Sequence, residues 1–258
     1  MNLELNGKVA FIAGSSRGIG FAIARAFLAE DASVCITGRD TAALSNAHRQ
    51  LAEAGSSGKV TSVACDLTKP DEISRALRHT REFLGRIDAI VPSVGSGSGP
   101  AGWDTTPDEW HTALGINLLP SVILAQSALP GLIAGGGGSI TFISSIAGCE
   151  AIPAPVAYSA AKAALQSAMK NLSRLVGPNG VRVNAVAPGN ILFPGGTWER
   201  KVAERKEFFE QYIAAEVPIR RFGTPEEIAS TVVFLSSPRS AFTTGACFVI
   251  DGGQTHIF

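Results

Sequence analysis

The sequence predicts an α/β fold, a doubly wound parallel sheet of about seven strands with helices on both faces. Short apolar runs of strand length alternate with amphipathic segments of helical length, an order typical of parallel sheets with right-handed crossovers. The 258 residues contain no long polar or proline-rich linker, so we expect residues 1–258 to form one domain. With 45% hydrophobic and 17% charged residues, the composition excludes a disordered chain.

The first strand, turn and helix organise the rest of the chain. Residues 9–13 form an apolar run suited to a buried strand, and Gly14, Gly18 and Gly20 then lead into a helix with apolar residues at helical spacing. Such a turn presents free N–H groups and the positive end of the helix dipole, which suits a phosphate. A side chain there would keep the phosphate from the backbone. A purely structural turn is the alternative, because the spacing is not G-x-G-x-x-G.

The second strand, residues 33–37, ends where a dinucleotide would place its adenosine ribose. An acidic residue at this point bonds the ribose 2′-hydroxyl, whereas arginine accommodates a 2′-phosphate. Gly38 provides no carboxylate, Arg39 provides a fork of donors, and Arg17 could reach the same phosphate. The pattern therefore favours NADP(H) over NAD(H). Asp40 could instead take the ribose, or cap the helix that follows.

Two further units continue the alternation. Asp66 follows the third strand, where its carboxylate could accept from an adenine amino group or could cap the loop before the next helix. The fourth strand leads into a glycine-rich loop over residues 95–102, which suits the ligand crevice of such sheets or a mobile surface loop. The predicted ranges are helix 41–54, strand 60–64, helix 70–84 and strand 87–91.

A long apolar helix is predicted over residues 108–134, with a kink at Pro120. Its apolar residues lie on more than one side, so something must cover it, and we expect a homo-oligomer, either a dimer or a tetramer. Asn117 lies within this helix. A buried amide must be satisfied, so Asn117 orders backbone or water, or makes a capping contact at the kink.

The fifth strand, residues 139–143, delivers Ser145 at its carboxyl end. An alanine-rich helix follows and carries Tyr158 and Lys162, which lie four residues apart on one helical face. An ammonium beside a phenol lowers the pKa of the phenol, so the tyrosine exchanges a proton near neutral pH. A tyrosine and lysine pair at this spacing is, on its own, more often a surface contact. The last predicted strands are residues 181–187 and 246–250.

These motifs together resemble the short-chain dehydrogenase/reductase family, in particular its members similar to 3-oxoacyl-[acyl-carrier-protein] reductase. The resemblance extends over essentially the whole chain and implies a Rossmann-like fold. It implies that Tyr158 is the general acid/base, that Lys162 lowers its pKa and bonds the nicotinamide ribose, that Ser145 positions the carbonyl oxygen and that Asn117 holds a water. The markers are Gly14-Ser-Ser-Arg-Gly18-Ile-Gly20, Asp66, Asn117, Ser145, Tyr158-Ser-Ala-Ala-Lys162, Pro188-Gly189 and Asp251-Gly252-Gly253.

The resemblance also implies the cofactor contacts, and the sequence departs from its pattern mildly at Ala13, where threonine is usual, and more strongly at two further places. Residues 92–95, Pro-Ser-Val-Gly, replace the common Asn-Asn-Ala-Gly, and Phe193 stands where threonine often bonds the carboxamide. We expect cofactor contacts, with NADP(H) preferred and NAD(H) possible, from Gly14, Ser16, Arg17, Gly18, Ile19, Gly20, Arg39, Asp66, Leu67, Gly95, Tyr158, Lys162, Pro188, Gly189 and Ile191.

The expected function is the NADPH-dependent reduction of a ketone to a secondary alcohol, with a 3-oxoacyl thioester as the first candidate. Alternatives are an NAD-dependent dehydrogenase of a secondary alcohol, sugar or polycyclic substrate, an isomerase or dehydratase, and a dinucleotide-binding sensor without turnover. In the family, a segment at about residues 190–215 covers the substrate. Its aromatic residues predict an apolar wall, and they are Trp198, Phe208, Phe209 and Tyr212.

Charge and cysteine content restrict the partners and the location. The number of basic residues, Lys and Arg, equals the number of acidic residues, Asp and Glu, at 22 each. Because the formal charge is balanced, neither nucleic acid nor a membrane surface is an expected partner. The N-terminus lacks a signal-peptide pattern, and we expect no uncharged run of membrane-spanning length and a cytoplasmic location. We expect no metal site and free thiols at the dispersed cysteines, which are Cys35, Cys65, Cys149 and Cys247.

Overall fold

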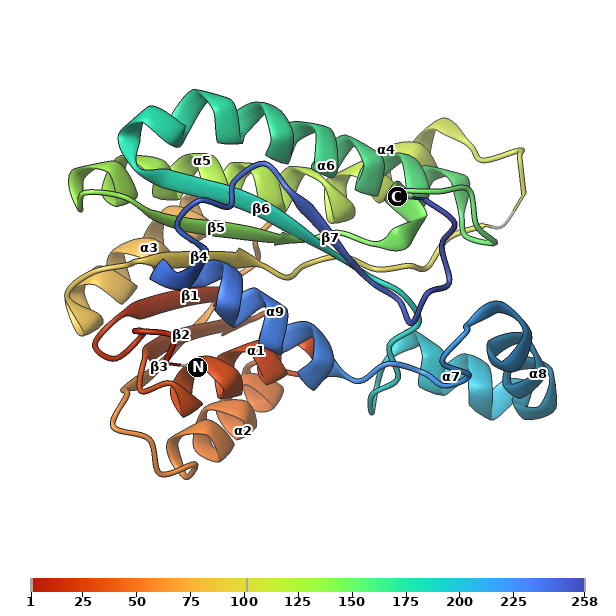
Figure 1. The fold of residues 1–258 in the computed structure, drawn as a ribbon, viewed down its shortest axis with the longest axis horizontal. Helices are drawn as coiled ribbons and strands as arrows, with labels where there is room; N and C mark the ends of the chain where they lie inside the picture. The colour runs from red at the N-terminus through yellow and green to blue at the C-terminus, as the bar shows by residue number, and fades with distance from the viewer. Residues whose placement is uncertain (1, 101, 258) are drawn as a thin grey trace.

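The computed structural model describes residues 2–100 and 102–257 and shows a seven-stranded parallel sheet between two layers of helices (Figure 1). The strand order is β3-β2-β1-β4-β5-β6-β7, and each neighbouring pair is parallel. The predicted doubly wound α/β fold is therefore confirmed. The strands are β1 (Val9–Ala13), β2 (Ser33–Gly38), β3 (Val60–Ala64), β4 (Ala89–Pro92), β5 (Gly138–Ile143), β6 (Val181–Pro188) and β7 (Cys247–Ile250).

The sheet is buried on both faces, and each face has its own hydrophobic core. Successive strand residues point to opposite faces, so Ile12 of β1 joins one core and Phe11 the other. Helices α1 (Gly18–Ala29), α2 (Thr41–Ala52) and α9 (Pro225–Ser236) cover the first face (Figure 1). The second face is covered by α3 (Pro70–Leu84), α4 (Pro107–Asn117), α5 (Leu119–Ala134) and α6 (Val156–Val176).

The predicted long helix is divided in two at Leu118, which separates α4 from α5. Pro120 lies in the first turn of α5, where its missing N–H costs no hydrogen bond. The expectation that no uncharged run reaches membrane-spanning length is wrong, because residues 111–149 contain no Lys, Arg, Asp or Glu. The stretch Pro107–Ala134 is long and apolar enough to cross a membrane, with 39% of its most apolar window buried. The break divides it, and α5 packs on α3 and β4, so its apolar composition also fits a core helix.

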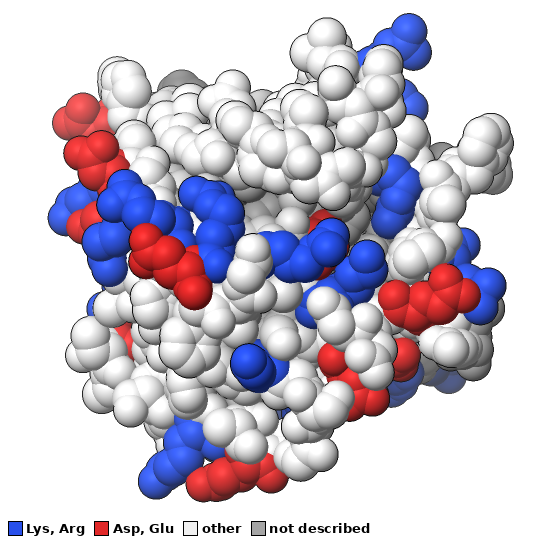
Figure 2. All heavy atoms as spheres, turned by 90° about the vertical axis from the view of Figure 1, so that its left-hand side faces the viewer, with Lys and Arg blue, Asp and Glu red and all other residues white. Residues whose placement is uncertain are grey.

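The strands run from left to right in Figure 1, so their carboxyl ends meet at the right-hand edge, beside α7 (Thr197–Glu204) and α8 (Lys206–Glu216). Figure 2 shows the opposite end, where Lys and Arg side chains form a loose band with acidic side chains near it. At this end Asp88 makes ion pairs with Lys8 at 3.6 Å and with Arg86 at 2.5 Å. Part of the positive charge where the strands begin is therefore neutralised locally.

Arg182 of β6 connects the sheet to the last turn of α9 and to the segment that follows it. Its guanidinium donates to the carbonyl oxygens of Leu235 at 2.7 Å and Ser237 at 3.1 Å, and to Ser240 Oγ at 2.9 Å. We expect Arg182→Ala to lower the free energy of unfolding by about 3 kcal/mol, because several partly buried acceptors lose their donor. Urea denaturation followed by circular dichroism measures this loss.

The matched control is Arg25→Ala, which removes an equally short ion pair at the surface. Arg25 lies 2.6 Å from Glu226, and both side chains are about half exposed. Removal of such a pair changes the free energy of unfolding by less than about 1 kcal/mol. Equal losses in the two variants would contradict the structural role of Arg182.

Candidate functional site

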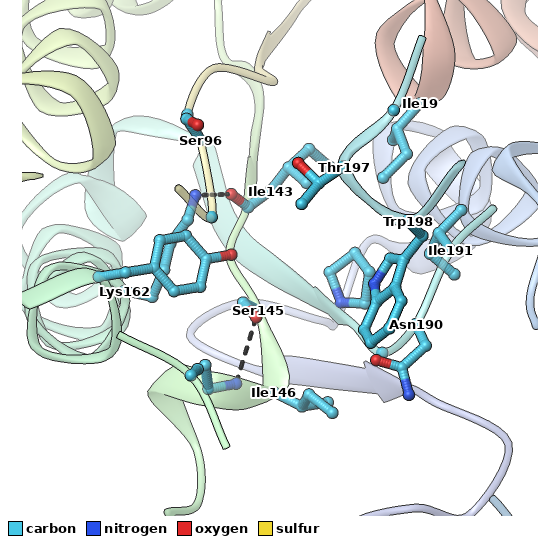
Figure 3. A pocket seen from close by; sticks show the side chains of 18 of the residues that line it. Ile19, Ser96, Ile143, Ser145, Ile146, Lys162, Asn190, Ile191, Thr197 and Trp198 are labelled. Carbon is cyan, nitrogen blue, oxygen red and sulfur yellow. Dashed lines mark hydrogen bonds between the residues drawn. The ribbon is translucent and has the colours of Figure 1, made fainter. Parts of the chain in front are cut away.

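A cavity of about 490 Å³ opens at the carboxyl ends of the strands. It lies between the glycine turn after β1, the loop after β4, the end of β5, the start of α6 and the segment after β6 (Figure 3). The described residues that line it include no aspartate or glutamate, whereas four are basic, namely Arg17, Arg39, Lys162 and Lys201. The cavity is therefore suited to an anionic ligand.

The glycine turn leaves backbone donors free beside this cavity. Gly14 and Gly18 have φ angles of +65° and +58°, and a Cβ built on Gly20 would lie 2.3 Å from the Gly14 carbonyl oxygen. A side chain at these positions would open the turn. Helix α1 begins at Gly18 with no side-chain cap on its first N–H groups and no acidic residue in its first turn. An anion would satisfy these donors and the helix dipole.

The residues expected near the adenosine end of a cofactor differ in whether they line the cavity. Arg17 and Arg39 line the cavity. Asp40 caps α2, because its Oδ1 accepts from Ala42 N and Ala43 N at 2.9 and 3.0 Å. The capping role that the sequence left open for Asp40 is therefore the one observed.

Asp66 likewise makes local contacts. Its Oδ1 accepts from the backbone N and the hydroxyl of Thr68 at 3.1 and 2.8 Å, in the loop before α3. These hydrogen bonds lower the pKa of Asp66. Of the residues expected to bind the cofactor, Ser16, Gly18, Asp66 and Leu67 are not part of the cavity lining, whereas the other predicted contacts are.

Ser145, Tyr158 and Lys162 meet at the other end of the cavity. Ser145 follows β5, and Tyr158 and Lys162 lie in the first half of α6. Lys162 is only 3% exposed, and its Nζ donates to the Ile143 carbonyl oxygen at 2.9 Å. Figure 3 shows Lys162 and Ser145 on the same side of the cavity. The expected convergence of strand end and helix is present.

The pKa values in this group differ from the sequence expectation. Burial raises the pKa of the Tyr158 phenol, and a hydrogen bond with Ser145 opposes this in part. The expected lowering of the Tyr158 pKa is not found in this structure, because burial is the largest effect and the Lys162 ammonium donates to the Ile143 carbonyl oxygen. Burial also lowers the pKa of Lys162 to about 8. Tyr158 is therefore protonated at neutral pH, as a proton donor must be.

Asn117 lies behind the cavity and holds the loop after β4. It is 2% exposed, its Oδ1 accepts from Ser96 N at 2.8 Å, and its Nδ2 donates to the Ala113 carbonyl oxygen at 3.1 Å. A Cβ built on Gly95 would lie 2.6 Å from Asn117 Oδ1 and 3.2 Å from Lys162 Nζ. Of the roles considered for Asn117, ordering of the backbone is the one observed.

Aromatic residues close the far side of the cavity. Trp198 and Tyr212 line it and stack with centroids 6.1 Å apart, and the Lys201 ammonium lies 4.6 Å from the Trp198 ring. Phe208 and Phe209 are outside the lining, although Phe209 packs edge-on against Trp198. Phe193 packs on the glycine turn, because a Cβ built on Gly18 would lie 2.4 Å from its ring.

Several lining residues were not identified from the sequence. The loop before α6 contributes Ile152, Pro153, Ala154 and Pro155, and the segment after β6 contributes Asn190. The position of this loop between Ser145 and Tyr158 was the available signal. Over residues 2–100 and 102–257, no group of three or more His, Cys, Asp or Glu residues could hold a metal, and the cysteines are free.

Comparisons with known proteins all match the chain to reductases and dehydrogenases. Residues 13–255 match the protein-family model described as enoyl-(acyl carrier protein) reductase. The chain is 32% identical over its full length and that of 2-(S)-hydroxypropyl-CoM dehydrogenase 3 of Xanthobacter autotrophicus. It is also 32% identical to L-sorbose reductase of Gluconobacter frateurii, crystallised with NADPH and L-sorbose, with a TM-score of 0.93 and full coverage of both chains. A 7α-hydroxysteroid dehydrogenase complexed with NADH and 7-oxo glycochenodeoxycholic acid is 30% identical, with a TM-score of 0.90 and coverage of 99% and 97%.

We expect the Lys162 ammonium to lose its proton near pH 8 in the free protein, because burial lowers its pKa to about 8. NMR titration of protein labelled at the lysine Cε carbons measures this midpoint, and Lys162→Arg identifies the signal by removing it. Since a buried ammonium is disfavoured, the charged form predominates only below the midpoint. A midpoint at the ordinary lysine value of about 10 would contradict the burial described above.

Proposed function

The chain belongs to the short-chain dehydrogenase/reductase family, and we propose that it reduces a ketone to a secondary alcohol with NADPH. Its relatives are dehydrogenases and reductases that act on CH–OH and C=O groups, and the protein is an oxidoreductase of this class. The observation that carries the proposal is the convergence of Ser145, Tyr158 and Lys162 on the cavity that the glycine turn also lines. We do not propose the alternative of a dinucleotide-binding sensor without turnover, because Ser145, Tyr158 and Lys162 are intact.

The geometry suggests a role for each polar side chain. Bound NADPH would supply the hydride. Tyr158, kept neutral by burial, donates its phenol proton to the substrate oxygen, and the Ser145 hydroxyl donates a hydrogen bond that fixes this oxygen. Lys162, held by the Ile143 carbonyl, places its positive charge beside the site. Proton transfer from a positioned side chain contributes a rate factor of about 10²–10⁴.

The residues present fit a dinucleotide with a 2′-phosphate. The uncapped first turn of α1 offers N–H donors for the pyrophosphate. Arg17 and Arg39 supply positive charge at the adenosine end, and the described part of the lining contains no carboxylate to repel a phosphate. Asp40 is engaged as a helix cap. One structural neighbour is crystallised with NADPH and another with NADH, so the preference for NADPH depends on this chain's own residues.

The end of the cavity near Trp198 and Tyr212, where we place the substrate, favours a ketone with an apolar carbon skeleton. Trp198 and Tyr212 form one wall, and Ile152 and Pro153 lie in the lining of the same cavity. Lys201 is the cation beside this wall, so a substrate that also carries an anionic group fits. A 3-oxoacyl thioester is our first candidate, and secondary alcohols, sugars and polycyclic ketones complete the screen.

We also propose that the protein is a homo-oligomer, a dimer or a homotetramer, in the cytoplasm. Ile116, Leu119 and Ile133 on α4 and α5 are 39%, 50% and 38% exposed. A second copy that covers them would remove apolar surface from water. The free cysteines fit a reducing compartment.

We expect NADPH to bind at least about tenfold more tightly than NADH, a difference of about 1.4 kcal/mol. Arg39→Ala should abolish most of this preference, because its guanidinium is a predicted partner of the 2′-phosphate. Titration of protein fluorescence with each cofactor measures the two dissociation constants. Arg49→Ala is the control, since it removes the same charge from an exposed position on α2, outside the cavity lining. A preference for NADH in the unmodified protein would reverse the assignment.

We expect Tyr158→Phe to lower kcat for ketone reduction by about 10²-fold or more, because the substrate oxygen loses its proton donor. The dissociation constant of NADPH should change little, since the ring and its packing are kept. Oxidation of NADPH followed at steady state measures kcat, and the fluorescence titration measures binding. Turnover at the unmodified rate in this variant would exclude Tyr158 as the donor.

A further inference from the structure

The C-terminal segment after β7 forms a rigid turn beside the aromatic wall. Asp251 accepts from Gly253 N at 2.9 Å through Oδ1, and from the backbone N and the hydroxyl of Thr255 at 2.8 Å through Oδ2. Gly252 and Gly253 have φ angles of +69° and +85°. The Gly252 carbonyl oxygen also accepts from Ile219 N at 3.2 Å, just after α8. The turn is therefore fixed both internally and against the covering segment.

Gln254 is the residue that this turn places in the interior. It is 6% exposed, and its Oε1 accepts from Asn190 Nδ2 at 2.8 Å. Its Nε2 donates to the hydroxyl of Tyr212 at 2.9 Å. The side-chain amide of Gln254 makes both hydrogen bonds, and it therefore links the segment after β6 to helix α8.

The two partners of Gln254 both line the cavity, whereas Gln254 itself does not. Tyr212 stacks on Trp198 at an interplanar angle of 17°. Figure 3 shows Trp198 and Asn190 together across the cavity from Lys162 and Ser145. A displacement of the Tyr212 hydroxyl would therefore move the ring that supports Trp198, at the wall opposite the catalytic groups.

We infer that Gln254 is a positioning residue for the substrate: its amide sets the place of the Tyr212 and Trp198 wall relative to the segment at Asn190. The inference rests on the proposed function, because it assigns this wall to the ketone substrate. Gln254 acts through Tyr212 and touches no reacting atom. Its contribution is to the binding of substrates that fill the wall.

The first test needs no substrate and uses Trp198 as its probe. The sequence has three tryptophans, so Trp103→Phe and Trp110→Phe together leave Trp198 as the sole tryptophan, which is excited selectively at a wavelength where tyrosine does not absorb. In this background, Gln254→Met keeps the side-chain length and removes both hydrogen bonds. We expect the quenching constant with acrylamide to rise about twofold, because loss of the anchoring bonds loosens the wall. An unchanged quenching constant overturns the inference, whether or not the protein reduces any ketone.

The matched control is Thr255→Val in the same background. It removes the Thr255 hydroxyl bond to Asp251, which weakens the same turn and leaves the Gln254 bonds in place. We expect its quenching constant to equal that of the parent. An equal rise in both variants would mean that the turn as a whole, and not the Gln254 amide, holds the wall, and the inference would then be wrong.

The second test is a double-mutant cycle on the kinetics of ketone reduction. Gln254→Met and Tyr212→Phe should each raise KM for an apolar aromatic ketone about fivefold, a change of about 1 kcal/mol. The double variant should show the same rise as Gln254→Met alone, because that change already breaks the bond to Tyr212. kcat should stay within about twofold of the unmodified value in each variant, and the dissociation constant of NADPH should stay within about twofold in Tyr212→Phe.

The outcomes of this cycle separate the two proposals. Additive effects on KM, or a fall in kcat with KM unchanged, would overturn the role of Gln254 while the reductase assignment stands. An unmodified protein that reduces no ketone in the screen would instead count against the proposed function, and the fluorescence measurement would still decide the role of Gln254.

Discussion

A buried ammonium is the group on which the arrangement of this site depends. Lys162 is 3% exposed and its Nζ donates to the carbonyl oxygen of Ile143 at the end of β5. A charge in such a place is costly unless its donors are satisfied. Strand β5, helix α6 and the loop at Gly95 therefore have to meet at fixed distances around it. Asn117 holds that loop from behind, so the packing that accommodates the lysine also shapes the cavity.

Most of the fold was predictable because its signals are local. Apolar runs of strand length, glycines after strands and amphipathic helices each follow from nearby residues. The expectation of no long uncharged run was wrong on the sequence itself. Residues 111–149 lack charged side chains, and composition alone does not distinguish a core helix pair from a membrane span. The break at Leu118 follows Asn117 and precedes Pro120, and the proline predicted a kink there but not two separate helices.

The site was predictable where a motif fixes the backbone, and less so where the outcome depends on tertiary contacts. The family resemblance selected Ser145, Tyr158 and Lys162 as candidates, and the strand end and helical spacing bring them to one cavity. The direction of the Tyr158 pKa was wrong because burial and the orientation of Lys162 toward Ile143 are not visible in the sequence. Gln254 was missed for the same reason, since its partners Asn190 and Tyr212 are distant along the chain.

The helices that cover the cavity contribute little to the two cores of the sheet. Helix α7 has no buried residue, and α8 has only Ile213. Neither core cluster includes a residue of these helices. Substitutions in them therefore bear little on whether the sheet folds, and selection can act on them for ligand fit alone. Such a division lets one scaffold acquire new specificities by exchange of a short surface segment, while the rest of the cavity lining stays unchanged.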